Sequence, residues 1–372
     1  MKTLLACFCL GVLGCALSTL AQSVVSSGSE PHVSEYVITE RGAHHRVWER
    51  VSWEASSLGT RVARTNAYTE LASGLNYPDP DTGEWRESRE EFELTPEGYA
   101  VARQGQHKVI ISPVLNDAEG AVDLETPDGR RLRSTVLALA LYNRATGQSL
   151  WLAEVSPDAE GRLVSPNEVQ FADAFQGFAC DLRYVYRRGD FRQEVLPREQ
   201  VAPETLAAAG FPLADSVLEI WTEFHEAPEP VIEARVIHRE ANPVRRTAMV
   251  EPDLISEDLD FGALKLPSGR AYLKGRAESD AEPVNILNRW RRLEGRVFLV
   301  ESIPLDQAEN LFAHLPTGDA SDPPFEGRAL YAGRRAPLPA LARQESRTIL
   351  MAQRSEERRV GKECRYPWAP YQ

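Results

Sequence analysis

The stretch Cys180-Asp-Leu-Arg-Tyr-Val-Tyr186, followed by Arg187-Arg-Gly-Asp190 and Phe191-Arg-Gln-Glu-Val195, decides the fold class. Apolar and polar side chains alternate along both halves, which is the pattern of half-buried strands. The segment between them carries Gly189, and we expect this glycine to adopt a positive φ in a tight turn. The stretch therefore predicts an antiparallel hairpin with one buried face.

The same alternation recurs along residues 33–303, with turn chemistry between the runs. Clear turn signals are Asp81-Thr82-Gly83, Asp128-Gly129, Ala145-Thr146-Gly147 and Glu160-Gly161. Helical patterns are scarce: we expect a short helix over 203–209 and an amphipathic helix over 304–315 that packs across one end of the body. Many short antiparallel strands with few helices predict an all-β fold, a large antiparallel β-sandwich.

The hairpin and its approach resemble a known arrangement. Phe171-Ala-Asp-Ala-Phe175, Asp181-Leu-Arg-Tyr184, Gly189 and Phe191-Arg-Gln-Glu-Val195 are similar to a hairpin near the start of very large exported bacterial proteins. Those proteins carry YD (RHS-type) repeats or concanavalin-like modules further along the chain. The resemblance is clear over these residues and looser over 36–303. It implies a supersandwich-like fold and downstream modules of the same chain as partners, but it implies no activity.

Residues 1–21 have the pattern of a secretory signal peptide. Lys2 is the positive region, an apolar run covers residues 4–17, and Thr19-Leu20-Ala21 puts small residues where signal peptidase cleaves. We therefore expect cleavage after Ala21 and a secreted or cell-envelope protein without a transmembrane segment in its mature form. A lipoprotein signal ending at Cys15 is the alternative, although the residues after Cys15 remain apolar.

The other segments of the chain have different compositions. We expect a flexible segment over 22–32, a β-sandwich domain over 33–303, a helix over 304–315 and a disordered linker over 316–353 that buries no core. Residues 354–372, which begin Arg354-Ser-Glu-Glu-Arg-Arg, resemble a translated sequencing adapter, and a genuine basic tail is the alternative. An adapter would mean that the natural protein continues beyond Gln353.

Composition and motifs exclude several classes of function. The net charge is −13, which argues against nucleic acid or an anionic membrane surface as the partner. No nucleophile elbow, metalloprotease motif, phosphate-binding glycine loop or paired CxxC occurs, so we predict no cofactor, no metal site and no catalytic residue. Asp79-Pro-Asp81 resembles the opening of a calcium loop, but Glu84 stands where the loop needs glycine, so we interpret it as a turn.

One strand carries the best candidate ligand-binding residues. In the run Leu218–His225, the even-numbered residues are predicted to face the core, so Trp221, Glu223 and His225 share the opposite face with Glu219. Tryptophan can stack on a sugar ring, while a carboxylate and an imidazole can bind hydroxyls or move protons. The alternative is a solvated strand face whose tryptophan covers neighbouring aliphatic side chains.

These observations predict a non-catalytic structural or presenting module of a larger secreted or cell-surface bacterial protein. The alternative is a carbohydrate-binding or carbohydrate-processing β-sandwich that uses Trp221, Glu223 and His225. Outside residues 1–21 and 354–372 the chain has a single cysteine, Cys180, which rules out a disulfide framework there. We expect Cys180 to be a small buried hydrophobic residue instead of a reactive thiol.

Overall fold

The computed structural model describes residues 34–55, 59–273, 282–316 and 328–330. In this part of the chain it has several antiparallel β-sheets and three short α-helices, so the all-β prediction is confirmed. The signal peptide, the segment 22–32, most of the 316–353 segment and residues 354–372 lie outside the described residues.

The chain forms two compact units, whereas we expected a single domain over 33–303. The first contains residues up to Thr39 together with Val47–Tyr68, and the second contains Glu40–Arg46 and the chain from Thr69 onward. The first unit is built from a three-stranded sheet of order β1-β2-β3. Its strands are β1 (Val37–Gly42), β2 (His45–Ala55) and β3 (Arg61–Leu71), whose ends belong to the second unit. The two units are described separately below.

The second unit contains one large and one smaller sheet. The ten-stranded sheet runs β23-β24-β17-β10-β9-β8-β7-β6, with β11 and β14 attached beside β10, and the five-stranded sheet runs β16-β15-β13-β12-β25. The strands of the large sheet are β6 (Glu93–Leu94), β7 (Ala100–Ala102), β8 (Lys108–Ile111), β9 (Val122–Glu125), β10 (Arg131–Asn143), β11 (Gln148–Val155), β14 (Phe175–Gln176), β17 (Ser216–His225), β23 (Leu287–Leu293) and β24 (Arg296–Pro304). Those of the smaller sheet are β12 (Gly161–Ser165), β13 (Glu168–Phe171), β15 (Cys180–Tyr186), β16 (Phe191–Pro197) and β25 (Arg328–Ala329).

Small sheets and short helices complete the second unit. The sheets are β4 (Asn76–Pro78) with β5 (Trp85–Glu87); β18 (Val231–Arg239), β19 (Asp253–Asp260) and β20 (Lys265–Leu266); and β21 (Arg270–Ala271) with β22 (Val284–Asn285). The helices are α1 (Pro203–Ala208), α2 (Pro243–Ala248), α3 (Leu305–Phe312) and a 3-10 turn, η1 (Leu213–Asp215). Helices α1 and α3 confirm the two predicted helices, with bounds that differ by up to three residues.

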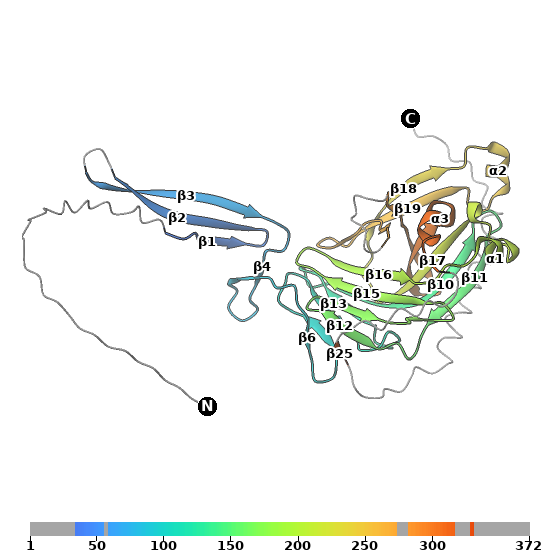
Figure 1. Ribbon diagram of the computed structural model, residues 1–372, viewed down its shortest axis with the longest axis horizontal. Helices are drawn as coiled ribbons and strands as arrows, with labels where there is room; N and C mark the ends of the chain where they lie inside the picture. The colour runs from blue at the N-terminus through green and yellow to red at the C-terminus, as the bar shows by residue number, and fades with distance from the viewer. Residues whose placement is uncertain (1–33, 56–58, 274–281, 317–327, 331–372) are drawn as a thin grey trace, which may run out of the picture. The chain divides into compact units, whose positions relative to one another are not determined.

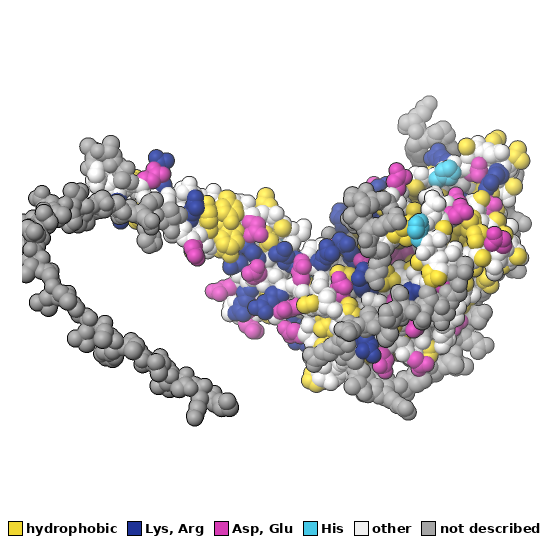
Figure 2. Space-filling model, in the orientation of Figure 1, with side chains coloured by type: hydrophobic (Ala, Val, Ile, Leu, Met, Phe, Trp, Pro, Cys, Tyr) yellow, Lys and Arg dark blue, Asp and Glu magenta, His cyan; other side chains and the backbone are white. Residues whose placement is uncertain are grey.

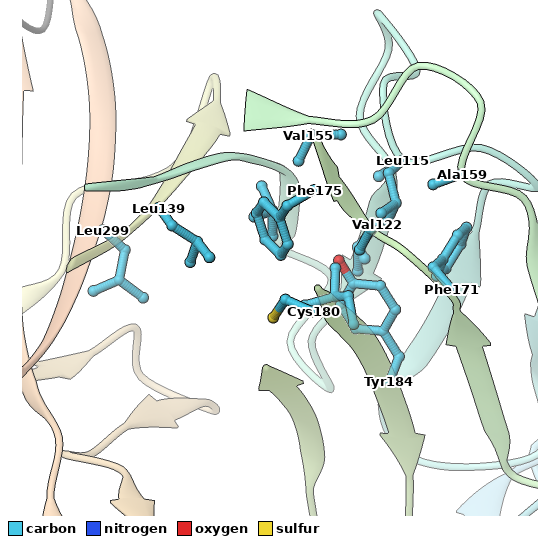
Figure 3. Packing of buried hydrophobic residues seen from close by; sticks show 14 of the residues in the cluster. Leu115, Val122, Leu139, Val155, Ala159, Phe171, Phe175, Cys180, Tyr184 and Leu299 are labelled. Atoms are coloured by element: carbon cyan, nitrogen blue, oxygen red, sulfur yellow. The ribbon is translucent and has the colours of Figure 1, made fainter. Parts of the chain in front are cut away.

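The main hydrophobic core lies between the two larger sheets (Figure 1). Figure 3 shows side chains of both sheets in one layer, among them Leu139 and Leu299 from the large sheet and Cys180 and Tyr184 from β15. All four are at most 6 % exposed. Burying apolar area from both sheets at roughly 25 cal/mol per Å² is the main force that holds the layers together.

The predicted hairpin is present, but Gly189 has a different role in its turn from the one we expected. Strands β15 and β16 pair antiparallel, and the backbone N–H of Arg187 donates to the carbonyl of Asp190 across the turn at 2.8 Å. Gly189 does not have a positive φ, so that expectation is wrong. The glycine instead permits a close approach, because a Cβ there would lie 3.0 Å from the Cβ of Ser73. Positive φ values do occur at the predicted turns of Gly83, Gly129 and Gly147, whereas Gly161 has none and is the first residue of β12.

Two elements were not predicted. Helix α2 begins after Asn242, whose side chain accepts from the N–H groups of Val244 and Arg245, and it has Pro243 in its first turn. Strand β25 pairs with β12, and Leu330 beside it is 5 % exposed within the main core. The expectation that no residue of the 316–353 segment buries a core is therefore wrong at Leu330, because a three-residue run surrounded by Pro, Gly and Asp gives almost no periodic signal.

Candidate functional site

Strand β17 places the three predicted residues on one face of the large sheet. It pairs with β10 on one side and with β24 on the other, and Trp221 lies opposite Ala138 and Val300. Side chains alternate along a strand, so Glu223 and His225 follow Trp221 on this face, while Leu218 and Phe224 join the main core. We call the face that carries Trp221 the outer face, since the other one packs against the five-stranded sheet.

The Trp221 side chain is enclosed. It is 4 % exposed and packs with Phe298 of β24 at 5.8 Å between ring centroids in an edge-to-face arrangement. Its indole Nε1 donates to the Glu219 carboxylate at 3.0 Å, which satisfies the one polar group of the ring. A small cluster of Ala140, Leu293, Phe298 and Val300 surrounds it. Trp221 thus covers neighbouring side chains and presents no open ring face on which a sugar could stack.

The Glu223 carboxylate forms a two-point ion pair with Arg296 of β24. Arg296 Nε donates to Oε1 at 2.6 Å, and Nη2 donates to Oε2. The pair is mostly buried, with 13 % and 24 % of the two side chains exposed, and the guanidinium also lies 5.1 Å from the ring centroid of Phe298. Two-point arginine–carboxylate pairs are among the strongest polar contacts in proteins. This pair therefore links β17 to β24.

The His225 imidazole is hydrogen-bonded to the strand on the other side. Its Nε2 lies 2.9 Å from the Thr135 hydroxyl of β10. Burial lowers the pKa of His225 below its ordinary value; the Glu223 carboxylate opposes this shift, and the guanidinium groups of Arg133 and Arg296 reinforce it. The neutral imidazole is thus favoured near pH 7. Together, Glu223 and His225 tie the central strand to both of its neighbours.

Glu301 is a polar residue that the sequence reasoning overlooked. It belongs to β24, on the inner face between Leu299 and Ile303, and faces the sheet that carries Tyr184. Its side chain is half-buried, and burial raises its pKa to about 7. Glu301 could have been found from the sequence, because it is a lone glutamate at a position where the alternation of Val297, Leu299 and Ile303 predicts an apolar side chain.

Glu301→Gln is expected to remove a pH-dependent loss of stability. Because the folded-state pKa is raised, folding favours the protonated carboxyl; its contribution is full below pH 4.5 and is lost as the pH rises through about 7. The full shift corresponds to roughly 3.5 kcal/mol at about 1.4 kcal/mol per pKa unit, and we expect about 2 kcal/mol because the side chain is partly solvated. Urea unfolding of both proteins at pH 5 and pH 8 measures it.

From pH 5 to pH 8, the free energy of unfolding of Glu301→Gln should rise by about 2 kcal/mol relative to that of the wild type. Other titrating groups, including His107 and His225, cancel in this comparison because both proteins carry them. A difference between the two proteins that stays constant from pH 5 to pH 8 would show that Glu301 is already ionised in the folded state.

Two further residues follow the predictions made from the sequence. Cys180 is fully buried, and burial raises the pKa of its thiol, so it behaves as a small hydrophobic side chain. Asp79 caps the turn before β5: its carboxylate accepts from the N–H groups of Asp81 and Thr82, both at 3.0 Å, and from Arg86 at 2.8 Å. The calcium-like stretch is therefore a hairpin turn, as predicted.

The described ranges contain no group of three or more His, Cys, Asp or Glu side chains placed to hold a metal ion. Among the helices in those ranges, none has the length and apolarity needed to cross a bilayer. In Figure 2, acidic and basic side chains are interspersed on the visible face, as expected of a surface with many ion pairs. Comparisons with protein-family models, with curated proteins and with solved structures find no match.

Proposed function

We propose that the chain is a non-catalytic structural module of a secreted or cell-surface bacterial protein that presents neighbouring modules of the same chain. The observation that carries the proposal is that the side chains on the outer face of β17 are engaged with the rest of the sheet. Glu223 and His225 bond to the two flanking strands, and Trp221 is enclosed. Side chains held in these contacts stabilise the sheet, and this supports a structural role for β17.

Strand β18 supports a role in contacts with a neighbouring module. All nine of its residues are exposed, and among the described strands it pairs only with β19. Its apolar side chains Val231, Ile232, Val236 and Ile237 are between 42 % and 74 % exposed. An edge strand of this kind offers unpaired backbone groups and apolar side chains to an added strand. We assign β18 to the contact with a downstream module, in keeping with the resemblance to large exported proteins.

A second candidate is carbohydrate binding, at a different place from the one predicted. In the first unit, the rings of Trp48 and Tyr68 are 8° from parallel, with 6.2 Å between centroids, and Tyr68 is 48 % exposed. Arg64 and Glu54 form an exposed ion pair on the same two strands. Tyr68 is the exposed member of this pair, and Trp48 is half-buried. An exposed tyrosine ring can stack on a sugar ring, and charged groups on the same strands can bind hydroxyls.

One assay separates these functions. The purified chain, Glu223→Gln and Tyr68→Ala are incubated with a panel of acidic and neutral polysaccharides, and both product release and retention in polysaccharide gels are measured. The structural proposal predicts neither. Product release that is lost in a folded Glu223→Gln variant would establish catalysis on β17, whereas retention lost only in Tyr68→Ala would establish sugar binding on β2 and β3.

Mass spectrometry of the exported protein should find Gln22 at its N-terminus; retention of Met1 would contradict secretion.

A further inference from the structure

A small cavity opens on the outer face of the ten-stranded sheet, beyond the Trp221 cluster. Its volume is about 30 Å³, and it lies among β10, β17, β23, β24 and the start of β19. Three arginines line it, Arg144, Arg289 and Arg291, together with the hydroxyl-bearing residues Tyr142 and Ser302. This volume exceeds the roughly 10–15 Å³ that such a cavity needs to hold one water molecule, so it has room for one small polar group.

Arg144 is the residue that makes this cavity unusual. It follows the last residue of β10 and is 8 % exposed, and its backbone is held by bonds to Asp215 and Glu251 at 2.7 and 2.9 Å. Its side-chain Nε and Nη1 are buried without a hydrogen-bond partner, and no ion pair in the described part of the chain includes it. Burying a guanidinium without a partner costs several kcal/mol, so a partner from outside the chain is physically favoured.

None of the acidic residues around the cavity forms an ion pair with Arg144 in the described part of the chain, and two of them have other partners. The Asp253 carboxylate is held by Arg246, the Glu219 carboxylate accepts from the Trp221 indole, and Glu251 also has a partner. Among the cations, Arg289 is paired with Glu257 at 3.3 Å. Arg291 is half-buried and, like Arg144, belongs to no ion pair among the described residues.

We infer that this cavity binds one oxyanion group, a carboxylate, phosphate or sulfate, through the guanidinium groups of Arg144 and Arg291. Guanidinium presents planar N–H donors whose spacing matches two oxygens of such a group. Tyr142 and Ser302 line the same space. Because only one small group fits, the rest of a larger ligand stays outside the cavity. This binding activity goes beyond the structural role proposed above and does not depend on it.

Thermal unfolding of the full chain in the presence of separate oxyanions tests the inference. Sodium phosphate, sulfate and acetate are titrated at constant ionic strength against sodium chloride. At least one oxyanion should raise the midpoint temperature with saturation in the millimolar range, and the preferred one identifies the source as a phosphate, sulfate or carboxylate. Arg144→Gln should abolish this shift, and Arg291→Gln should weaken binding at least tenfold.

The control is Arg103→Gln, which removes the same charge from an exposed position and should bind as the wild type does. This control also removes the general stabilisation that phosphate and sulfate give to most proteins, because that effect does not saturate and is shared by all variants. A shift of equal size in wild type, Arg144→Gln and Arg291→Gln, or no oxyanion-specific shift at all, would overturn the inference and leave the cavity to water. If Arg144→Gln does not fold, Arg291→Gln decides.

Discussion

Phe171→Ala is expected to lower the free energy of unfolding by about 3–5 kcal/mol. Phe171 is fully buried in the core between the two larger sheets, and its ring meets that of Tyr184 edge-to-face at 6.1 Å between centroids. The substitution removes this contact and leaves a void that close-packed neighbours cannot fill. Urea unfolding followed by circular dichroism measures the loss.

The matched control is Tyr272→Ala, which truncates an aromatic side chain that is 41 % exposed in the same unit. We expect it to change the free energy of unfolding by about 0.5 kcal/mol or less. Equal losses for the two variants would mean that Phe171 does not lie in a packed layer between sheets, which would contradict the described architecture.

Glu223→Gln is expected to cost about 2–3 kcal/mol of stability, and Arg296→Gln a similar amount. Each variant leaves one member of a mostly buried pair without its partner; full burial would raise the cost to roughly 3–5 kcal/mol. The same urea unfolding measures both variants. Glu91→Gln is the matched control, because its pair with Arg89 is 3.2 Å long but has 39 % and 63 % of the side chains exposed. Such pairs contribute about 0–1 kcal/mol.

A catalytic Glu223 would give the opposite pattern. Active-site residues are often retained at some expense to stability, so their replacement by an isosteric neutral residue leaves stability unchanged or improves it. Unchanged stability of Glu223→Gln, with loss of any activity found in the polysaccharide assay, would therefore favour the carbohydrate-processing alternative.

Local patterns in the sequence predicted the hairpin and the alternation along β17, but the expectation of one buried face is wrong for β15, which is buried on both faces except at Arg183. The alternation over Cys180–Tyr186 placed the hairpin, and that over β17 placed Trp221, Glu223 and His225 on one face. These predictions succeeded because a strand's two faces are decided by neighbours two residues apart. The positive φ at Gly189 was predicted wrongly, because the close approach that this glycine permits is to Ser73, which is distant in the sequence.

Contacts between segments that are far apart in the chain could not be predicted from the sequence. Arg296 lies 73 residues from Glu223, and nothing local links the two. The sequence therefore could not show that the candidate carboxylate is already paired. Arg144 is a similar case: its burial depends on the start of β19, more than 100 residues further along the chain. Pairing in antiparallel sheets is non-local, so register and burial at such sites become visible only in the fold.

The central claim is that the outer face of β17, which carries Trp221, Glu223 and His225, holds the sheet together. A double-mutant cycle of Glu223→Gln, Arg296→Gln and the combined variant tests it most directly, with free energies of unfolding measured by urea denaturation. We expect a coupling energy of about 1.5–3 kcal/mol between the two side chains. A coupling energy near zero would mean that Glu223 is not committed to Arg296 and is free for another role, which would contradict the account.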